Sequence, residues 1–298
     1  MADVLKGVSD ALAGLVESAG GSVLRVEGRR RMASSGIAWS ADGLVVTAHH
    51  TLERDDDLAV GLPGGERAPA SLIGRDPSTD LALLRAEVRG LSPARWADPE
   101  TARVGHLVLA LGRPGRTAQA TLGIVSALGE AWRAPGGGAI DRFLQTDVVM
   151  APGFSGGPLM AADGAALGMN TSGLVPGLSL AVPAPTVRRV VEALQAHGRV
   201  RRGYLGIGAQ PARLPAALAE QLGQESGLLL LSVEPGGPAE AAGLLLGDTI
   251  VAAGGQAVRG MGDLIEHLGD DRVGQTLTVS LLRGGALEER QVVIGERP

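Results

Sequence analysis

The segment Gly153-Phe154-Ser155-Gly156-Gly157-Pro158 places one hydroxyl in a turn with glycines on both sides. Glycines let a backbone approach a substrate closely and point several N–H groups at one position, as an acyl-transfer site requires. The same string also fits the nucleophile turn of an α/β-hydrolase, or a tight turn with no chemistry. The order of the other candidate residues along the chain distinguishes between these interpretations.

A histidine and an aspartate precede this serine: His50 closes one apolar run and Asp80 opens another. The order histidine, aspartate, serine is that of chymotrypsin-like proteases, whereas an α/β-hydrolase places its acid and then its histidine after the serine. The hydrolase alternative would have to use His197 or His267, which lie in predicted helical or linker sequence without a parallel βαβ framework. Chain order therefore favours the protease.

Short β-type runs punctuated by Gly, Pro and Asp fill residues 21 to about 182. Because no helix of about 10 to 15 residues separates them, they predict an antiparallel barrel or sandwich rather than a parallel sheet. These runs include Ser22–Val26, Leu44–Ala48, Leu58–Leu62, Leu81–Ala86, Leu107–Leu111, Thr121–Ala127 and Leu178–Val182.

Helical spacing is seen at both ends of this β-rich region. Residues 1–20 carry Val4, Val8, Leu12 and Leu15 at helical spacing and lack a basic leader before a continuous apolar core. We therefore expect an amphipathic helix rather than a signal peptide, and a cytoplasmic location. A second helix is predicted from about residue 185 to residue 197, with Gly198 as its stop.

The chain changes character after the basic linker 199–202. Residues 203–298 alternate strand-like runs with short helical ones, which predicts an α+β domain of ordinary size. We expect strands at Gly227–Val233, Thr249–Ala253 and Thr276–Leu282 and helices at Ala239–Ala242 and Gly262–Leu268. The predicted organisation is thus a helix over 1–20, a β domain over 21–198, the linker, and a second domain over 203–298.

Composition excludes several classes of protein. The formal net charge of −5 gives no basic face for nucleic acid, and no apolar run is long enough for a transmembrane helix. With no cysteine, neither thiol catalysis nor a zinc–thiolate site is available. The run Asp55-Asp56-Asp57 lacks the alternating spacing of a calcium loop, so we expect no metal and no cofactor.

Taken together, the segments around His50, Asp80 and Ser155 resemble the three catalytic motifs of the HtrA (high-temperature-requirement) family of chymotrypsin-like serine proteases. The stretches Gly105–Gly112, Gly123–Leu128 and Gln145–Asp147 also match that family in order and spacing. The resemblance implies a mainly β fold, a double-barrel protease domain followed by a PDZ domain. It makes Ser155 the nucleophile, His50 the general base and Asp80 its orienting carboxylate, with the N–H groups of Gly153 and Ser155 as the oxyanion hole.

Two residues depart from the family pattern. His49 and Phe154 stand where asparagine is usual. Adjacent side chains of a strand point to opposite faces, so only one of the two histidines can face Ser155, and the alignment favours His50. Phe154 either narrows the cleft or packs against the barrel.

The specificity pocket is inferred from the same alignment. Its floor falls at Val149, six residues before Ser155, and one wall holds Leu178 and Leu180. Since none of these is acidic, we expect cleavage after aliphatic residues rather than after Lys or Arg, whose buried charge would lack a partner.

The second domain resembles a PDZ domain in the bacterial strand arrangement, on strings such as Glu234-Pro235-Gly236-Gly237-Pro238-Ala239 and Gly247-Asp248-Thr249-Ile250. The resemblance implies that a loop formed by Tyr204, Leu205, Gly206 and Ile207 holds a peptide C-terminal carboxylate while the peptide adds as a strand. Met261, Leu264, Ile265 and Leu268 would line the pocket for its last side chain.

We therefore expect an ATP-independent serine endopeptidase of protein quality control that cleaves unfolded or damaged proteins. Its PDZ domain would bind peptide C-termini and tether substrate or regulate activity. The family resemblance also implies a homotrimer. A non-catalytic, chaperone-like peptide-binding protein on the same fold is the main alternative.

Overall fold

A computed structural model describes residues 2–269 and 272–297. The chain divides into two compact units, one ending at Val200 and one beginning at Arg201. Each unit has its own apolar core. Each is therefore described by itself.

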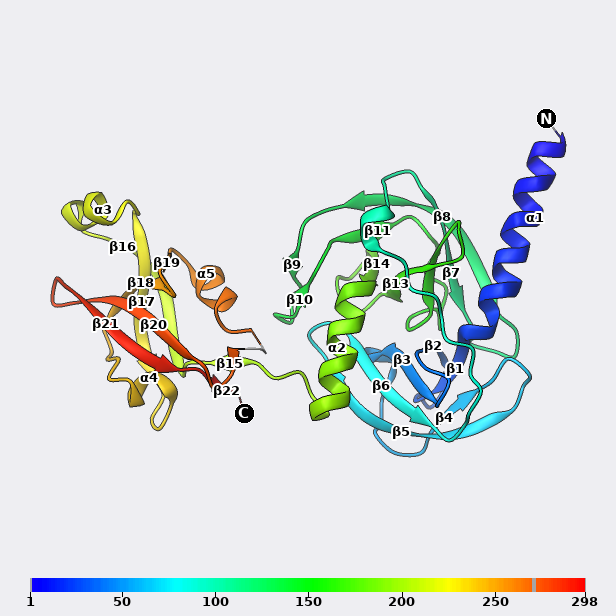
Figure 1. Cartoon of the computed structure of the whole chain (residues 1–298), viewed down its shortest axis with the longest axis horizontal. Coiled ribbons are helices and arrows are strands. Elements are labelled where there is room, and N and C mark those ends of the chain that lie inside the picture. Colours follow the sequence, from blue (N-terminus) through cyan, green and yellow to red (C-terminus); the bar gives the residue numbers. More distant parts are fainter. Residues whose placement is uncertain (1, 270–271, 298) are drawn as a thin grey trace. The chain divides into compact units, whose positions relative to one another are not determined.

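The first unit is built on two closed barrels of six antiparallel strands, within the described residues (Figure 1). Around the first barrel the strands run β1, β2, β3, β6, β5, β4, and around the second β11, β14, β13, β12, β7, β8. The first barrel comprises β1 (Val23–Glu27), β2 (Ser34–Ala38), β3 (Leu44–Ala48), β4 (Leu58–Gly61), β5 (Arg67–Asp76) and β6 (Leu81–Ala86). The second comprises β7 (Leu107–Gly112), β8 (Gln119–Leu128), β11 (Leu144–Thr146), β12 (Pro158–Ala161), β13 (Ala166–Thr171) and β14 (Ser179–Pro183).

This arrangement confirms the predicted mainly β fold and excludes the α/β-hydrolase alternative. Short segments complete the unit: β9 (Trp132–Arg133), β10 (Ala139–Ile140) and the 3₁₀ turns η1 (Gly20–Ser22), η2 (His49–Thr51) and η3 (Pro99–Thr101). His197, one histidine the hydrolase would need, ends a helix, and His267 lies in the other unit.

Helix α2 (Ala184–His197) covers the junction of the two barrels. Its buried face, which includes Val187, Val190 and Leu194, packs with Leu83 of the first barrel and Met169 of the second in one apolar cluster. Gly198 ends the helix in the left-handed conformation, at φ 69°, as the sequence predicts. The cluster therefore fixes the two barrels against each other at the place where the candidate site is divided between them.

Helix α1 (Ala2–Ala19) packs only at its C-terminal end. Leu15 and Ala19 are buried against Leu111 and Met160 of the second barrel. The predicted apolar face is present, but its N-terminal half stays uncovered, with Val4 70% exposed.

The second unit is a small α+β domain. Its sheet has the order β16, β17, β18, β20, β21, with β19 paired to β18, so β16 is an edge strand. The strands are β15 (Gly203–Tyr204), β16 (Ile207–Arg213), β17 (Ser226–Val233), β18 (Thr249–Ala253), β19 (Gln256–Ala257), β20 (Thr276–Arg283), β21 (Ala286–Val293) and β22 (Gly295–Glu296). The helices are α3 (Ala216–Leu222), α4 (Pro238–Ala241) and α5 (Met261–Glu266).

Candidate active site

The first barrel supplies a histidine and a carboxylate. His50 lies in η2, directly after β3, and Asp80 is the last residue of the turn before β6. Asp76 accepts hydrogen bonds from the hydroxyls of Ser78 and Thr79, each at 2.7 Å, and so holds that turn. Asp80 itself has φ +59°, a left-handed conformation that few residues other than glycine, asparagine and aspartate adopt.

The two side chains lie within hydrogen-bond distance of each other. His50 Nδ1 lies 2.7 Å from Asp80 Oδ2, and the His50 backbone N–H donates to Asp80 Oδ1 at 2.8 Å. The Asp80 side chain is only 4% exposed, and the Thr171 hydroxyl of the second barrel also donates to its Oδ2. These contacts fix the imidazole plane and leave Nε2 as the nitrogen available to other groups.

The second barrel supplies the serine. Ser155 lies in the turn before β12, where Gly153 and Gly156 have φ +88° and +90°. A Cβ at position 156 would lie 2.1 Å from the carbonyl oxygen of Ser35, so only glycine fits there. The backbone of the turn is held by hydrogen bonds between Gly156 and Asn170, at 2.9 Å, and between Asn170 and Gly157, at 2.8 Å.

The Ser155 hydroxyl points to Ser172. Its Oγ lies 3.1 Å from Ser172 Oγ and accepts the Ser172 N–H at 3.4 Å. Thr171, which bonds Asp80, and Ser172, which bonds Ser155, are consecutive in the chain, so one short segment joins the carboxylate to the nucleophile turn. No hydrogen bond joins Ser155 to His50 within the described part of the chain, and proton transfer between them requires the Ser155 side chain to turn away from Ser172.

The same turn presents two backbone donors. Neither the N–H of Gly153 nor that of Ser155 has an acceptor among residues 2–269 and 272–297. The N–H between them, that of Phe154, is occupied by the carbonyl of Ala151 at 3.0 Å. The turn can therefore offer two N–H groups to an oxyanion without breaking a hydrogen bond of its own.

Phe154 has a packing role. Its side chain is 1% exposed and belongs to the core of the second barrel. A Cβ at position 112 would lie 2.7 Å from its ring, so the ring rests directly on the backbone of Gly112. Of the two roles considered for Phe154, the structure shows packing against the barrel.

The three residues predicted for the specificity pocket differ widely in exposure. The Val149 side chain is 69% exposed, whereas Leu180 is 2% exposed inside the cluster beneath α2, with Leu178 packed on it. Their segments do adjoin, since Ser179 Oγ donates to the Val148 carbonyl at 3.0 Å. Six-residue spacing placed the backbone near the site but did not fix which way the side chains point. The aliphatic preference stays a prediction.

In the second unit most of the predicted peptide-binding residues gather in one apolar cluster. Leu205 and Leu264 are buried in it, and Ile207, Met261 and Leu268 pack against it. Tyr204 precedes them in β15, and its ring lies beside Gly206, whose φ of +75° shapes the loop. Ile265 is not part of this cluster. Leu268 lies beyond the end of α5, two residues after Glu266.

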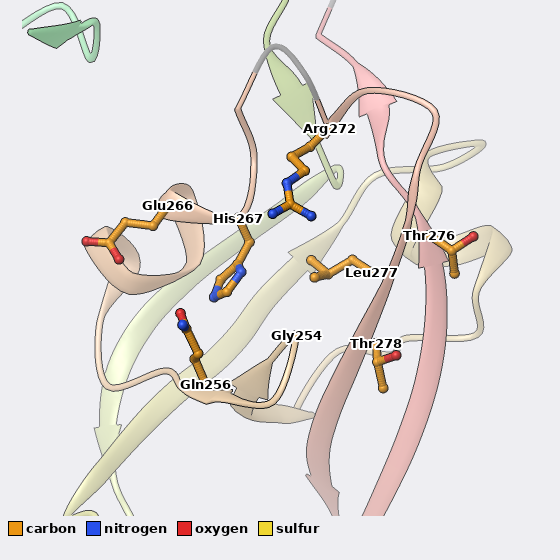
Figure 2. Close-up of a pocket in the computed structure, with 8 residues that line it drawn as sticks. All are labelled: Gly254, Gln256, Glu266, His267, Arg272, Thr276, Leu277 and Thr278. Carbon is orange, nitrogen blue, oxygen red and sulfur yellow. The ribbon is translucent and has the colours of Figure 1, made fainter. Parts of the chain in front are cut away.

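A separate hollow of about 420 Å³ lies beside the C-terminal end of α5 (Figure 2). Figure 2 shows the His267 ring and the Arg272 guanidinium pointing toward it, above Gln256. It shares no residue with the predicted peptide-binding set. It therefore adds nothing to the site for a peptide C-terminus.

His49 precedes His50 in η2. Its Nδ1 is buried without a hydrogen-bond partner in the part of the chain that the structure describes. Burial first, and then the positive charge of Arg75, lower the pKa of His49 below its ordinary value. The unfolded chain therefore binds this proton more readily than the folded one.

This shift predicts a pH-dependent loss of stability. The contribution of His49 is complete above the unfolded pKa of about 6.5 and is lost as pH falls below it. We expect the free energy of unfolding to fall more steeply with acidification in the parent protein than in His49→Asn. Urea unfolding followed by fluorescence of the three tryptophans, all in the first unit, measures this. Parallel pH profiles in the two proteins would contradict the prediction.

Comparisons with known proteins agree with this architecture. The family profile of the trypsin-like peptidase domain matches residues 34–169, and that of the PDZ domain matches residues 203–294. Two similar curated proteins are named probable periplasmic serine endoprotease DegP-like. The protein from Ectopseudomonas mendocina is 37% identical over 91% of this chain and 58% of its own length. The one from Brucella suis is 36% identical over 89% of this chain and 52% of its own length. The chain thus spans little more than half the length of these relatives.

Solved structures match over nearly the whole chain. The HtrA-type protease AlgW with a decapeptide is 29% identical, covers 96% of this chain and 98% of its own, and superposes with a TM-score of 0.79. A serine endoprotease from Yersinia pestis is 30% identical, and the match covers 95% of this chain and 97% of that protein's chain, with a TM-score of 0.78. Both units therefore have counterparts in these proteins.

The predicted cytoplasmic location is wrong, because the similar curated proteins are named as periplasmic. The prediction rested on the lack of a basic leader in residues 1–20 and on the absence of cysteine, and neither feature identifies a compartment. No helix of the described residues combines the length and apolar character needed to cross a membrane.

The matches to both domain profiles agree with the structure. The strand order of the two barrels fits a trypsin-like peptidase domain, and the sheet of the second unit, with its edge strand, fits a PDZ domain. Relatives of known structure extend this agreement across both units at about 30% identity. We conclude that the chain belongs to the HtrA-type family of serine proteases, with a trypsin-like peptidase domain followed by a PDZ domain.

Proposed function

We propose that this chain is a serine endopeptidase in which Ser155 is the nucleophile, His50 the general base and then acid, and Asp80 the carboxylate that orients His50. One observation carries the proposal: Thr171 and Ser172, adjacent in sequence, contact Asp80 and Ser155 respectively and so join the His50–Asp80 pair to the nucleophile turn. Labelling of Ser155 by a serine-directed fluorophosphonate tests for a competent nucleophile and base together.

The proposed reaction begins when the Ser155 hydroxyl turns from Ser172 toward His50. Oγ attacks the carbonyl carbon of the substrate while His50 Nε2 takes its proton, and Asp80 stabilises the imidazolium through Nδ1–H. The N–H groups of Gly153 and Ser155 donate to the oxyanion. His50 then gives its proton to the departing amine as the C–N bond breaks, and water hydrolyses the acyl-enzyme by the same two proton transfers.

A non-catalytic peptide-binding role is the second candidate, and one observation favours it. The Ser155 hydroxyl is bonded to Ser172 and not to His50 in the described structure. The hydrogen bond to Ser172 contributes only about 0.5 to 1.5 kcal/mol, which substrate binding can offset. Fluorophosphonate labelling in the parent but not in His50→Ala supports the protease, and no labelling in either supports the binding protein.

The proposed substrates are unfolded or damaged proteins, whose C-termini the PDZ domain holds. β16 offers a free sheet edge to an added strand, and the partly buried Ile207, Met261 and Leu268 offer apolar side chains to the peptide. Solved HtrA-type structures that contain peptides, such as AlgW with a decapeptide, support this role. Relatives named as periplasmic support quality control outside the cytoplasm as the setting.

Removal of the second unit is expected to separate hydrolysis from substrate capture. Truncation after Val200 keeps the His50–Asp80 pair and Ser155, and the first unit has its own cores. We expect measurable hydrolysis of a short chromogenic peptide, slower degradation of unfolded casein, and no response to added hydrophobic C-terminal peptides. Parallel assays on both forms test this. Unchanged casein degradation together with an unchanged peptide response would rule out a tethering or regulatory role.

We also propose that the chain self-associates through α1, as the homotrimer implied by its family would. Val4 and Leu5 are 70% and 67% exposed on a helix whose other end is anchored in the second barrel. Val4→Glu with Val8→Glu, one turn further along the same face and 45% exposed, should shift sedimentation velocity from oligomer to monomer, since buried charges would replace apolar contacts. Ala13→Glu, on the opposite face of the helix, should sediment like the parent. A parent that sediments as a monomer would contradict the proposal.

A further inference from the structure

A buried hydroxyl of the first barrel contacts the nucleophile turn of the second. Ser35 lies in β2 and is 0% exposed. Its Oγ accepts the backbone N–H of Arg113 at 2.8 Å and lies 2.6 Å from the carbonyl oxygen of Gly153. Because an N–H can only donate, the single hydroxyl proton of Ser35 goes to the Gly153 carbonyl. The direction of this hydrogen bond is therefore fixed by the structure.

The bond holds the peptide unit that separates the two candidate oxyanion donors. This unit runs from the Gly153 carbonyl, bonded by Ser35, to the Phe154 N–H, bonded by Ala151 at 3.0 Å. The N–H groups of Gly153 and Ser155 stand on either side of it. Gly153 lacks a side chain and so permits other backbone conformations at little steric cost. Hydrogen bonds, rather than sterics, therefore set the orientation of this peptide.

Ser35 contacts the turn with its backbone as well. Its N–H donates to the Ser155 carbonyl at 3.2 Å, and its own carbonyl closely approaches Gly156. Thr47 holds that carbonyl in place, since its hydroxyl donates to it at 2.7 Å. Ser35 thus contacts the turn at Gly153, Ser155 and Gly156.

The donor to Ser35 is itself firmly held. The Arg113 guanidinium is buried and donates to the carbonyls of Val23, at 2.6 Å, and of Gly20 and Arg116, each at 2.8 Å. These bonds anchor the backbone of residue 113 where it leaves β7. The hydroxyl of Ser35 therefore lies between a fixed donor and the carbonyl that it orients.

We propose that Ser35 is a positioning residue for the oxyanion hole, acting through the Gly153–Phe154 peptide. The proposal rests on the proposed protease function of Ser155. Loss of the hydroxyl leaves the Arg113 N–H and the Gly153 carbonyl buried without partners, and the peptide between the two donors loses one of its two anchors. The consequence is a poorer fit to the transition state rather than to the substrate.

The test compares two substitutions of nearly equal shape. Ser35→Thr keeps the hydroxyl, and Ser35→Val has the same branching without it. We expect kcat for a chromogenic peptide to be about 10- to 100-fold lower in Ser35→Val than in Ser35→Thr, with KM changed less than about twofold. Ser22→Ala removes another buried hydroxyl, bonded to Ala19 at 2.8 Å away from the turn, and should retain the parental kcat. Equal kcat values for Ser35→Val and Ser35→Thr would overturn the proposal.

A second measurement does not depend on activity. Hydrogen–deuterium exchange of the Phe154 amide should be faster in Ser35→Val than in the parent, Ser35→Thr or Ser22→Ala, because its peptide is then held at one end only. If the parent shows no Ser155-dependent hydrolysis, the proposed function fails while exchange still tests the positioning contact. Equal exchange in all four proteins would overturn the role of Ser35 whatever the activity.

Discussion

Ser155→Ala is expected to lower the rate of casein hydrolysis by about 10⁶-fold. The residues of such a site act as a unit, so His50→Ala should cost about as much as Ser155→Ala, and the double variant little more. Ser155 lies in a turn whose backbone is held by Asn170, and removal of one hydroxyl leaves those bonds intact. Release of labelled casein fragments measures the loss, and unchanged thermal unfolding shows that the variants are folded.

The two histidines provide the matched control for this experiment. His49→Asn is expected to retain most of the activity, because the side chain that pairs with Asp80 belongs to His50. The reverse result, an inactive His49→Asn beside a fully active His50→Ala, would show that the wrong histidine has been assigned. Casein hydrolysis by Ser155→Ala at the parental rate would remove the nucleophile from the proposal.

Asp80→Asn is expected to reduce kcat by about 10⁴-fold while leaving the fold intact. An amide that turns its NH₂ toward His50 Nδ1 favours the tautomer with its proton on Nε2, which cannot accept the proton of Ser155. Asparagine suits position 80 because it tolerates φ +59°, whereas alanine would add backbone strain to the loss of charge. Steady-state kinetics on a chromogenic peptide measure the effect.

Asp57 is a suitable control for Asp80. It is the other described residue apart from glycine with a positive φ, +48°, and its side chain is 78% exposed. Asp57→Asn therefore makes the same chemical change in the same backbone conformation away from the site. Its kcat should equal that of the parent. A loss in Asp80→Asn no greater than in Asp57→Asn would show that the carboxylate of Asp80 does not act on His50.

The sequence predicted the elements whose residues carry a local signal. The runs Leu44–Ala48, Leu81–Ala86 and Thr249–Ala253 are strands with those bounds, because apolar residues are concentrated in them. The helix before Gly198 begins one residue earlier than predicted. His50, Asp80 and Ser155 could be proposed as site residues because each stands beside such a run and their order along the chain is informative.

Other elements carried no such signal. β2 was missed because its sequence, Ser-Ser-Gly-Ile-Ala, looks like a turn, although every residue of it is buried. The strand β21 was missed because its charged residues face solvent on an outer strand of the second sheet. Helix α3 was also missed, although Pro215 before it and Gly223 after it are start and stop signals of a helix.

The supporting residues of the site could not be predicted for a different reason. Thr171, Ser172 and Ser35 are small polar residues that are common throughout the chain. Their roles follow from contacts across 17 to 118 residues of sequence, which local patterns do not contain. Val149 illustrates a second limit. Its spacing from Ser155 along the chain does not determine where its side chain points, and that side chain is largely exposed.

The division of the site between two barrels sets when the protein can first become active during its synthesis. His50 and Asp80 belong to the barrel that leaves the ribosome first, and Ser155 and Thr171 to the one that follows. A chain in which only the first barrel has formed holds the proposed base without the proposed nucleophile. The proposed protease is therefore expected to become competent only after the second barrel has formed beside the first.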